Sequence, residues 1–209
     1  MQTSEPMQLT PVLRHPLGLP AGSVRAVMSL TIVGLFWLLL LMPPDKGVQV
    51  PLYLYFLLGM VLLFFASHGH SIAPQGTSHK SPLGFPKGSI RAIIFLGTAA
   101  VIGWCIYSNR GLLLERLTPS GQPLTQWPYL LLALMGGFFL GWLIRLGPWK
   151  SLYWFQDIQA WLSLIAMGLL GVDIVIRLFV NPHMEQDFDL PLWEEILVGV
   201  VAFYFGVRS

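Results

Sequence analysis

Six apolar blocks, each close to the length of a membrane-spanning helix, dominate this sequence of 209 residues. They lie at 23–42, 50–67, 89–107, 128–146, 158–180 and 192–207. About 20 helical residues cross a hydrocarbon core of about 30 Å. Only 11% of the residues are charged, whereas soluble domains carry about 25%. The sequence therefore predicts an all-α integral membrane protein with six transmembrane helices. The sixth helix is short or re-entrant in an alternative interpretation, because Glu194 and Glu195 stand in its first turn.

Part of the chain is duplicated. Residues 16–28 (PLGLPAGSVRAVM) return as residues 82–94 (PLGFPKGSIRAII), and residues 157–160 align with 89–92 as a fainter third copy. In addition, a proline precedes a glycine by eight positions three times, at Pro51 and Gly59, Pro128 and Gly136, and Pro191 and Gly199. These marks predict three tandem αα-hairpin repeats. Such copies are parallel repeats, which a pseudo-threefold bundle would accommodate. Coincidence in a membrane sequence rich in proline and glycine is the alternative.

The repeats and the loops between them give the predicted organisation and orientation. The segments are an N-terminal cytoplasmic interfacial segment (1–22), hairpin 1 (23–67), a connector loop (68–88), hairpin 2 (89–146), an interfacial connector (147–157) and hairpin 3 (158–209). With six spans, eight Lys and Arg residues fall on the side of the two termini and four on the other side. Positive residues favour the cytoplasmic side. We therefore expect both termini in the cytoplasm, in an inner or plasma membrane.

The duplicated segment carries a candidate lipid-binding or anion-binding motif. Ser23 and Ser89 are expected as N-caps of the first helix of each hairpin, and Arg25 and Arg91 fall in the first turn. A helix N-terminus beside a guanidinium favours an anion such as a lipid phosphate. The alternative interpretation is that both arginines only anchor the helices at the cytoplasmic surface.

Asp173 and Arg177 are the charged pair expected within a span. Their spacing of four residues places them on one helix face, where they can form an ion pair. Charged residues inside a membrane mark function by default. A structural pair close to the outer headgroups and a transport or proton-relay element are the two interpretations.

Glycines within the spans are expected where helices pack closely, because small residues let helix backbones approach. The predicted packing positions are Gly59, Gly136, Gly137, Gly141 and Gly199.

No enzyme motif occurs in the sequence: it has no P-loop, no G-x-S-x-G and no H-E-x-x-H. His68, His70 and His79 share a loop that contains no cysteine and no acidic residue, so no metal site and no cofactor are predicted. No basic tract suggests nucleic acid. The sequence favours a non-catalytic membrane subunit or scaffold that contacts the lipid bilayer and either partner membrane proteins or further copies of itself. A small channel or transporter with a pathway between the hairpins is the alternative.

Overall fold

The computed structural model describes residues 22–42, 50–67, 83, 85–86, 88–118, 123–147, 153–180 and 191–208. The elements are α1 (Ser23–Leu41), α2 (Leu52–Ser67), α3 (Ser89–Leu117), α4 (Pro123–Leu146), α5 (Tyr153–Val175), the π-helix η6 (Ile176–Val180) and α6 (Pro191–Arg208). No strand occurs within these ranges. The predicted all-α class is therefore confirmed for the described residues.

Within the described part of the chain, four helical segments are long and apolar enough to cross a membrane. They are Ser23–Leu41, Ser89–Ser108, Thr125–Leu146 and Asp157–Val180. Helix α2 is apolar but has only 16 residues, and α6 carries Glu194, Glu195 and Arg208 within its 18 residues. The chain therefore has the character of a membrane protein, whereas six spans remain a prediction.

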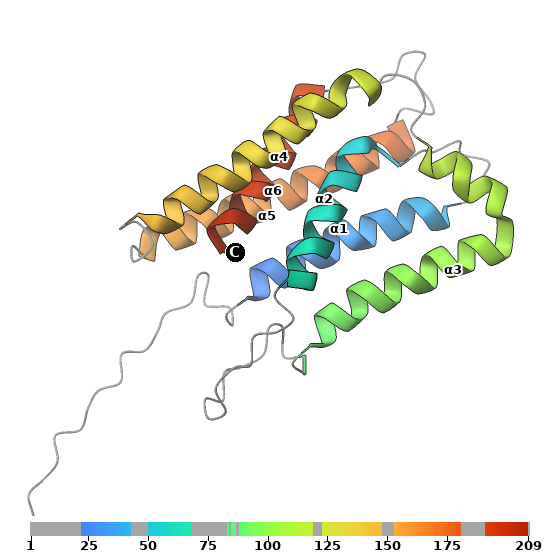
Figure 1. Cartoon of the computed structure of the whole chain (residues 1–209), viewed down its shortest axis with the longest axis horizontal. Coiled ribbons are helices and arrows are strands. Elements are labelled where there is room, and N and C mark those ends of the chain that lie inside the picture. The colour runs from blue at the N-terminus through green and yellow to red at the C-terminus, as the bar shows by residue number, and fades with distance from the viewer. Residues whose placement is uncertain are drawn as a thin grey trace, which may run out of the picture.

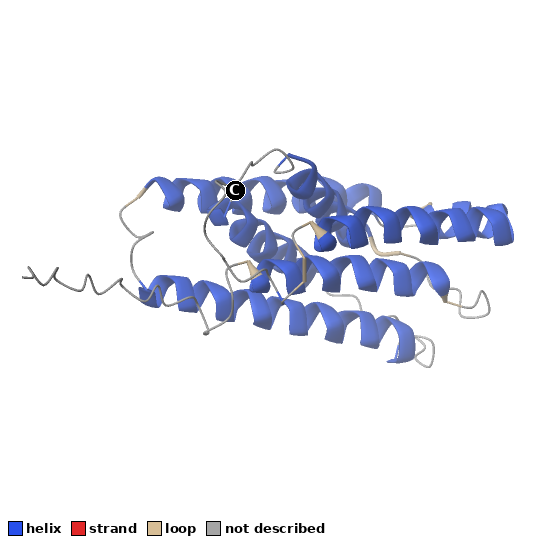
Figure 2. Ribbon diagram, turned by 90° about the horizontal axis from the view of Figure 1, so that it is seen from below, coloured by secondary structure: helices blue, strands red, loops and turns tan. Residues whose placement is uncertain are grey.

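Successive helices run in alternating directions. Figure 1 shows that α1, α3 and α5 begin at one end of the molecule, here called the proximal end, and that α2, α4 and α6 begin at the opposite, distal end. Seen from below, most helices lie along the long axis of the molecule (Figure 2). Each end of the bundle therefore collects helix termini from segments far apart in the sequence.

The helices do not pack as three equivalent hairpins. Helix α4 packs most extensively against α6, while α3 packs mainly along α1. Figure 1 places α3 and α4 on opposite sides of the molecule. The pseudo-threefold arrangement and the tandem repeats are therefore not confirmed, because the two long helices of the predicted second hairpin are separated by the rest of the bundle.

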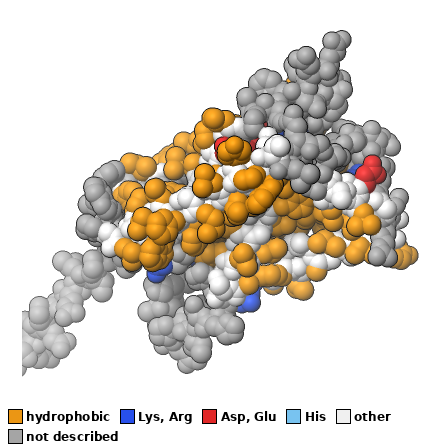
Figure 3. Space-filling view, turned by 45° about the horizontal axis from the view of Figure 1, so that its top comes forward, with side chains coloured by type: hydrophobic (Ala, Val, Ile, Leu, Met, Phe, Trp, Pro, Cys, Tyr) orange, Lys and Arg blue, Asp and Glu red, His pale blue; other side chains and the backbone are white. Residues whose placement is uncertain are grey.

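The core lies where α1, α2, α5 and α6 meet. Met28 and Ile32 of α1, Leu57 of α2, Leu170 of α5 and Phe205 of α6 are almost completely buried in it. Apolar side chains also cover much of the outer surface, as the face in Figure 3 shows. An apolar exterior suits helices whose solvent is lipid.

The duplicated segment builds the same local structure twice. Gly22 and Gly88 cap α1 and α3 with φ of 83° and 85°, a conformation that glycine adopts without strain. Each accepts a hydrogen bond of 2.9 Å at its carbonyl, from the N–H of Ala26 or Ala92. The predicted serine caps are wrong: the capping residue is the glycine, and neither cap has a side-chain hydrogen bond. A left-handed residue at this position sets the helix start through the backbone alone.

Several helix limits differ from the apolar blocks. Helix α3 continues to Leu117, well past the block that ends at 107, and turns sharply in its last part (Figure 1). Helix α4 begins at Pro123, so Pro128 lies inside it, and α5 begins at Tyr153. Hydropathy locates the segment that can lie in lipid, whereas the backbone hydrogen bonds extend beyond it into more polar sequence.

Candidate functional site

Four polar side chains meet at the distal end of the bundle, and we call them the distal polar cluster: Tyr53, Asp173, Arg177 and Glu194. Tyr53 stands in the first turn of α2, Glu194 in the first turn of α6, and Arg177 in the π-helix that ends α5. The alternating directions of the helices bring these three termini together. Tyr53 is 0% exposed, Glu194 4% and Asp173 9%.

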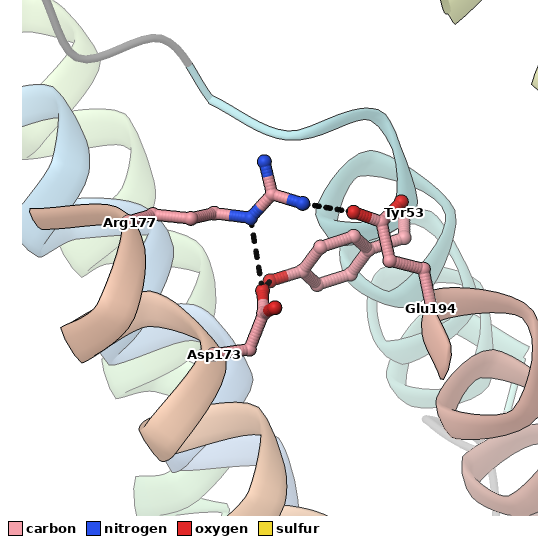
Figure 4. Close-up of polar contacts among 4 residues, drawn as sticks. All are labelled: Tyr53, Asp173, Arg177 and Glu194. Atoms are coloured by element: carbon pink, nitrogen blue, oxygen red, sulfur yellow. Dashed lines mark hydrogen bonds and ion pairs between the residues drawn. The ribbon is translucent and has the colours of Figure 1, made fainter. Parts of the chain in front are cut away.

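Arg177 joins the cluster. Its Nε donates to Asp173 Oδ2 at 3.0 Å, and its second terminal nitrogen pairs with the carboxylate of Glu194. The hydroxyl of Tyr53 donates to the same Asp173 oxygen at 2.5 Å. Figure 4 shows the guanidinium between the two carboxylates, with the phenol reaching Asp173 from α2. Asp173 and Arg177 together thereby connect α5 and its terminal π-helix to α2 and α6.

The cluster is charged as well as buried. It contains two carboxylates and one guanidinium, and the Arg177 side chain keeps only 24% of its surface exposed. Burying a charge is costly unless it is paired and hydrogen-bonded. The guanidinium centre also lies 5.9 Å from the centre of the Tyr53 ring, within cation–π range. Removal of Arg177 would take a cationic partner from two buried carboxylates.

The π-helix places Arg177 within this cluster. Helix α5 changes from α-helical to π-helical geometry at Ile176, between Asp173 and the end of the span. Such insertions are rare and are found frequently at functional sites. The local irregularity and the buried charges therefore coincide, as expected of a site rather than of a plain lipid-facing helix.

No protein-family model, curated protein or solved structure matches this chain. The function is therefore argued from its own residues. Among the described residues, no three His, Cys, Asp or Glu side chains are grouped to hold a metal ion. The loop histidines His68, His70 and His79 lie outside the described residues.

A second cationic side chain, Arg116, caps α1. It lies in the last turn of α3 and is 7% exposed, and its Nη1 donates to the carbonyls of Leu40 at 2.6 Å and Leu39 at 3.4 Å. These carbonyls belong to the last turn of α1, where the helix leaves carbonyls without partners and carries partial negative charge. Tyr55 of α2 donates in turn to the carbonyl of Leu117 at 3.4 Å. Arg116 lies outside the apolar block 89–107 of the sequence, and in the structure it joins α3 to α1.

Arg116→Gln is expected to lower the free energy of unfolding by about 1–3 kcal/mol, because it leaves buried carbonyls with weaker partners or none. Reversible unfolding in mixed detergent micelles measures this change. Arg91→Gln on the same helix is the matched control and is expected to stay within about 0.5 kcal/mol, since Arg91 is exposed. Equal effects of the two variants would contradict the capping role.

The two copies of the predicted anion motif differ in how far they are buried. Ser23 is 1% exposed, and its hydroxyl accepts a hydrogen bond from the N–H of Leu83 at 3.3 Å. A lipid phosphate contact does not fit this burial. Arg25 is half-buried over the ring of Phe64 at 4.8 Å. Ser89 is half-buried and Arg91 is exposed, so the second copy of the motif is the more accessible one.

The predicted packing glycines fall into two groups. A Cβ built on Gly137 or Gly141 would run into the α6 backbone, at Gly199 and Phe203 respectively. A Cβ on Gly199 would find only an ordinary contact of 3.6 Å, and a Cβ on Gly59 or Gly136 would meet no atom within 4 Å. Close approach therefore occurs between α4 and α6, and it does not occur at Gly59 or Gly136.

Sequence reasoning missed Tyr53 and the capping role of Arg116. Tyr53 stands two residues after Pro51, in the first turn of α2, and its hydroxyl reaches Asp173. The signal that could have found Tyr53 is the presence of polar residues at several helix termini that share the distal end. Arg116 gave no such signal, because the apolar block of α3 ends nine residues before it.

Proposed function

We propose that this protein is a non-catalytic multi-pass subunit or scaffold that packs within a larger assembly of membrane proteins. The observation that carries the proposal is the position of α3. Only 17% of the α3 span and 11% of the α4 span are buried, against 50% of the α1 span, but α4 packs extensively against α6. A helix held along one neighbour leaves most of its surface to lipid or to another protein.

The residues on the free face of α3 favour a protein contact. Gly97 faces α1, where a Cβ would meet the ring of Trp37, and the Trp37 indole N–H donates to Thr98 at 3.1 Å. Helix periodicity puts Ala99 and Gly103 on the opposite face, and both are exposed. Together they form a small-xxx-small pair, which typically supports helix association in membranes.

Helix α4 carries a small-xxx-small pair that already packs against another helix of the same chain. Gly137 and Gly141 lie against the backbone of α6. At Gly103 of α3, by contrast, a Cβ would meet no atom within 4 Å. The comparison between α4 and α3 supports the packing of a further helix on the exposed face of α3. This helix would come from a partner protein or from another copy of this chain.

Gly103→Leu is expected to remove co-purifying membrane proteins, or the homo-oligomer, because the added side chain fills the space that a neighbouring helix needs. The experiment is purification in mild detergent, with native mass measurement and identification of bound proteins. Gly168→Leu is the matched control, since Gly168 of α5 is also exposed with open space at its Cβ. The proposal fails if the wild-type protein is a monomer, or if both variants keep the same associations.

A channel or transporter is the second candidate, favoured by the buried charges of the distal polar cluster. The buried face of α5 also carries Gln159 and Ser163 near the proximal end. Between Ser163 and Asp173, however, the buried residues Ala166, Met167 and Leu170 are apolar. This interval is about 15 Å long. A conduction path needs groups that replace water around the solute, so the subunit proposal is preferred. Ion flux through the isolated protein in liposomes would reverse the preference.

A further inference from the structure

An open cavity of about 530 Å³ lies between α2 and α4. Its α2 wall is one helix face that extends from Leu52 to Leu63, and its α4 wall consists of Leu134, Met135 and Phe138. This volume falls within the range of about 300–1,000 Å³ typical of ligand sites. Gly59 stands in the middle of the α2 wall, where a Cβ would meet no atom within 4 Å. A missing side chain thus contributes to the free volume.

The walls offer almost no polar chemistry. Among the described residues that border the cavity, only Tyr55 has a side chain with a polar group, and its hydroxyl is directed to the last carbonyls of α3. Residues 134–138 occupy the centre of the Thr125–Leu146 span, so the cavity lies at the depth of the lipid hydrocarbon. An occupant must therefore be apolar along its whole enclosed length. Met60 and Met135, one on each wall, can adapt to a flexible chain.

We propose that this cavity binds one acyl chain of a membrane phospholipid. The α2 wall rises about 16 Å from Leu52 to Leu63. One leaflet contributes about half of the roughly 30 Å hydrocarbon core, so its acyl chains extend over about 15 Å. The length of the α2 wall and the length of an acyl chain therefore agree. The inference is independent of the proposed subunit role, which concerns the free face of α3.

A transmembrane helix of a partner is a poorer occupant. It would follow α2 for about three turns, but α4 provides a second wall over residues 134–138 only, which is little more than one turn. A helix is about 10 Å wide with its side chains, and it needs small residues on both walls to come close. The walls here are lined by large residues on both sides of Gly59.

The test is photolabelling in vesicles. The protein is reconstituted into phosphatidylcholine vesicles that contain a trace of phosphatidylcholine with a diazirine in one acyl chain, and the labelled peptides are mapped by mass spectrometry. We expect label concentrated on the two walls of the cavity. Gly59→Phe, which fills the cavity, should lower this label about tenfold, the change expected when contacts with about two methylene groups are lost.

Gly171→Phe provides the matched control, because Gly171 of α5 is also half-buried with no atom within 4 Å of its Cβ. It should leave the cavity label unchanged. Met135→Trp narrows the cavity from the α4 side at a side chain that is 60% exposed, and it should lower the label even if Gly59→Phe fails to fold. Uniform labelling of all lipid-facing helices would overturn the proposal. So would wall label that persists in the folded filling variants, or a partner helix cross-linked to these walls.

Discussion

Gly137→Val should lower the free energy of unfolding by about 3 kcal/mol, the upper end of what overpacking usually costs. The reason is the close approach of α4 to α6. A Cβ on Gly137 would meet the carbonyl oxygen of Gly199, with the Gly199 Cα at 3.1 Å. A flexible side chain could move aside, but a helix backbone can yield only if the whole contact between the two helices opens. Reversible unfolding in mixed detergent micelles measures the loss.

Gly136→Val is the control one residue away. Gly136 is exposed, and a Cβ at this position would have no neighbouring atom within 4 Å. The substitution is expected to change the free energy of unfolding by less than about 0.5 kcal/mol. Gly199→Ala should also be mild, because the added carbon would sit 3.6 Å from the Ala133 carbonyl oxygen. If Gly136→Val and Gly137→Val destabilise equally, the α4–α6 contact is not the cause.

Hydropathy predicted the helical class and six spans, of which four have membrane length among the described residues, because length and hydropathy are properties that each segment carries by itself. The pairing of the segments could not be predicted in this way. Gly136 and Gly137 are adjacent in an apolar sequence, yet only Gly137 faces a neighbouring helix. Which of the two lies in the contact depends on how α4 is rotated against α6, and the low amphipathicity of a lipid-facing helix does not record that rotation.

Only the part of the distal polar cluster that lies on one helix could be predicted from the sequence. Asp173 and Arg177 are neighbours on one helix face by spacing alone, and the structure brings them to 3.0 Å. Tyr53 and Glu194 join them across 120 and 17 residues of sequence. The duplicated segment, by contrast, has a local structure that does not depend on its place in the fold. Gly22 and Gly88 have the same backbone geometry, although α1 is central and α3 is peripheral. Local sequence sets the local turn, and tertiary packing decides the rest.

Arg177→Gln should be the most destabilising change in the distal polar cluster, at about 3–5 kcal/mol, because it removes a cationic partner of two buried carboxylates. Tyr53→Phe should cost about 1.5–3 kcal/mol, since one hydrogen bond to a charged acceptor is lost while Arg177 stays in place. Both values come from reversible unfolding in mixed detergent micelles. An effect of Arg177→Gln below about 0.5 kcal/mol, the level of an ordinary surface change, would contradict the burial of these charges.

The decisive variant combines Arg177→Gln with Asp173→Asn and Glu194→Gln. Neutralising the carboxylates removes the buried negative charges that Arg177 had paired, so the triple variant should be more stable than Arg177→Gln alone. Independent sites do not show such a coupling. If the triple variant also keeps its protein associations, the cluster acts by holding α2, α5 and α6 together. If it folds and associates normally but loses an ion flux that the wild type shows in liposomes, the charges belong to a transport element instead.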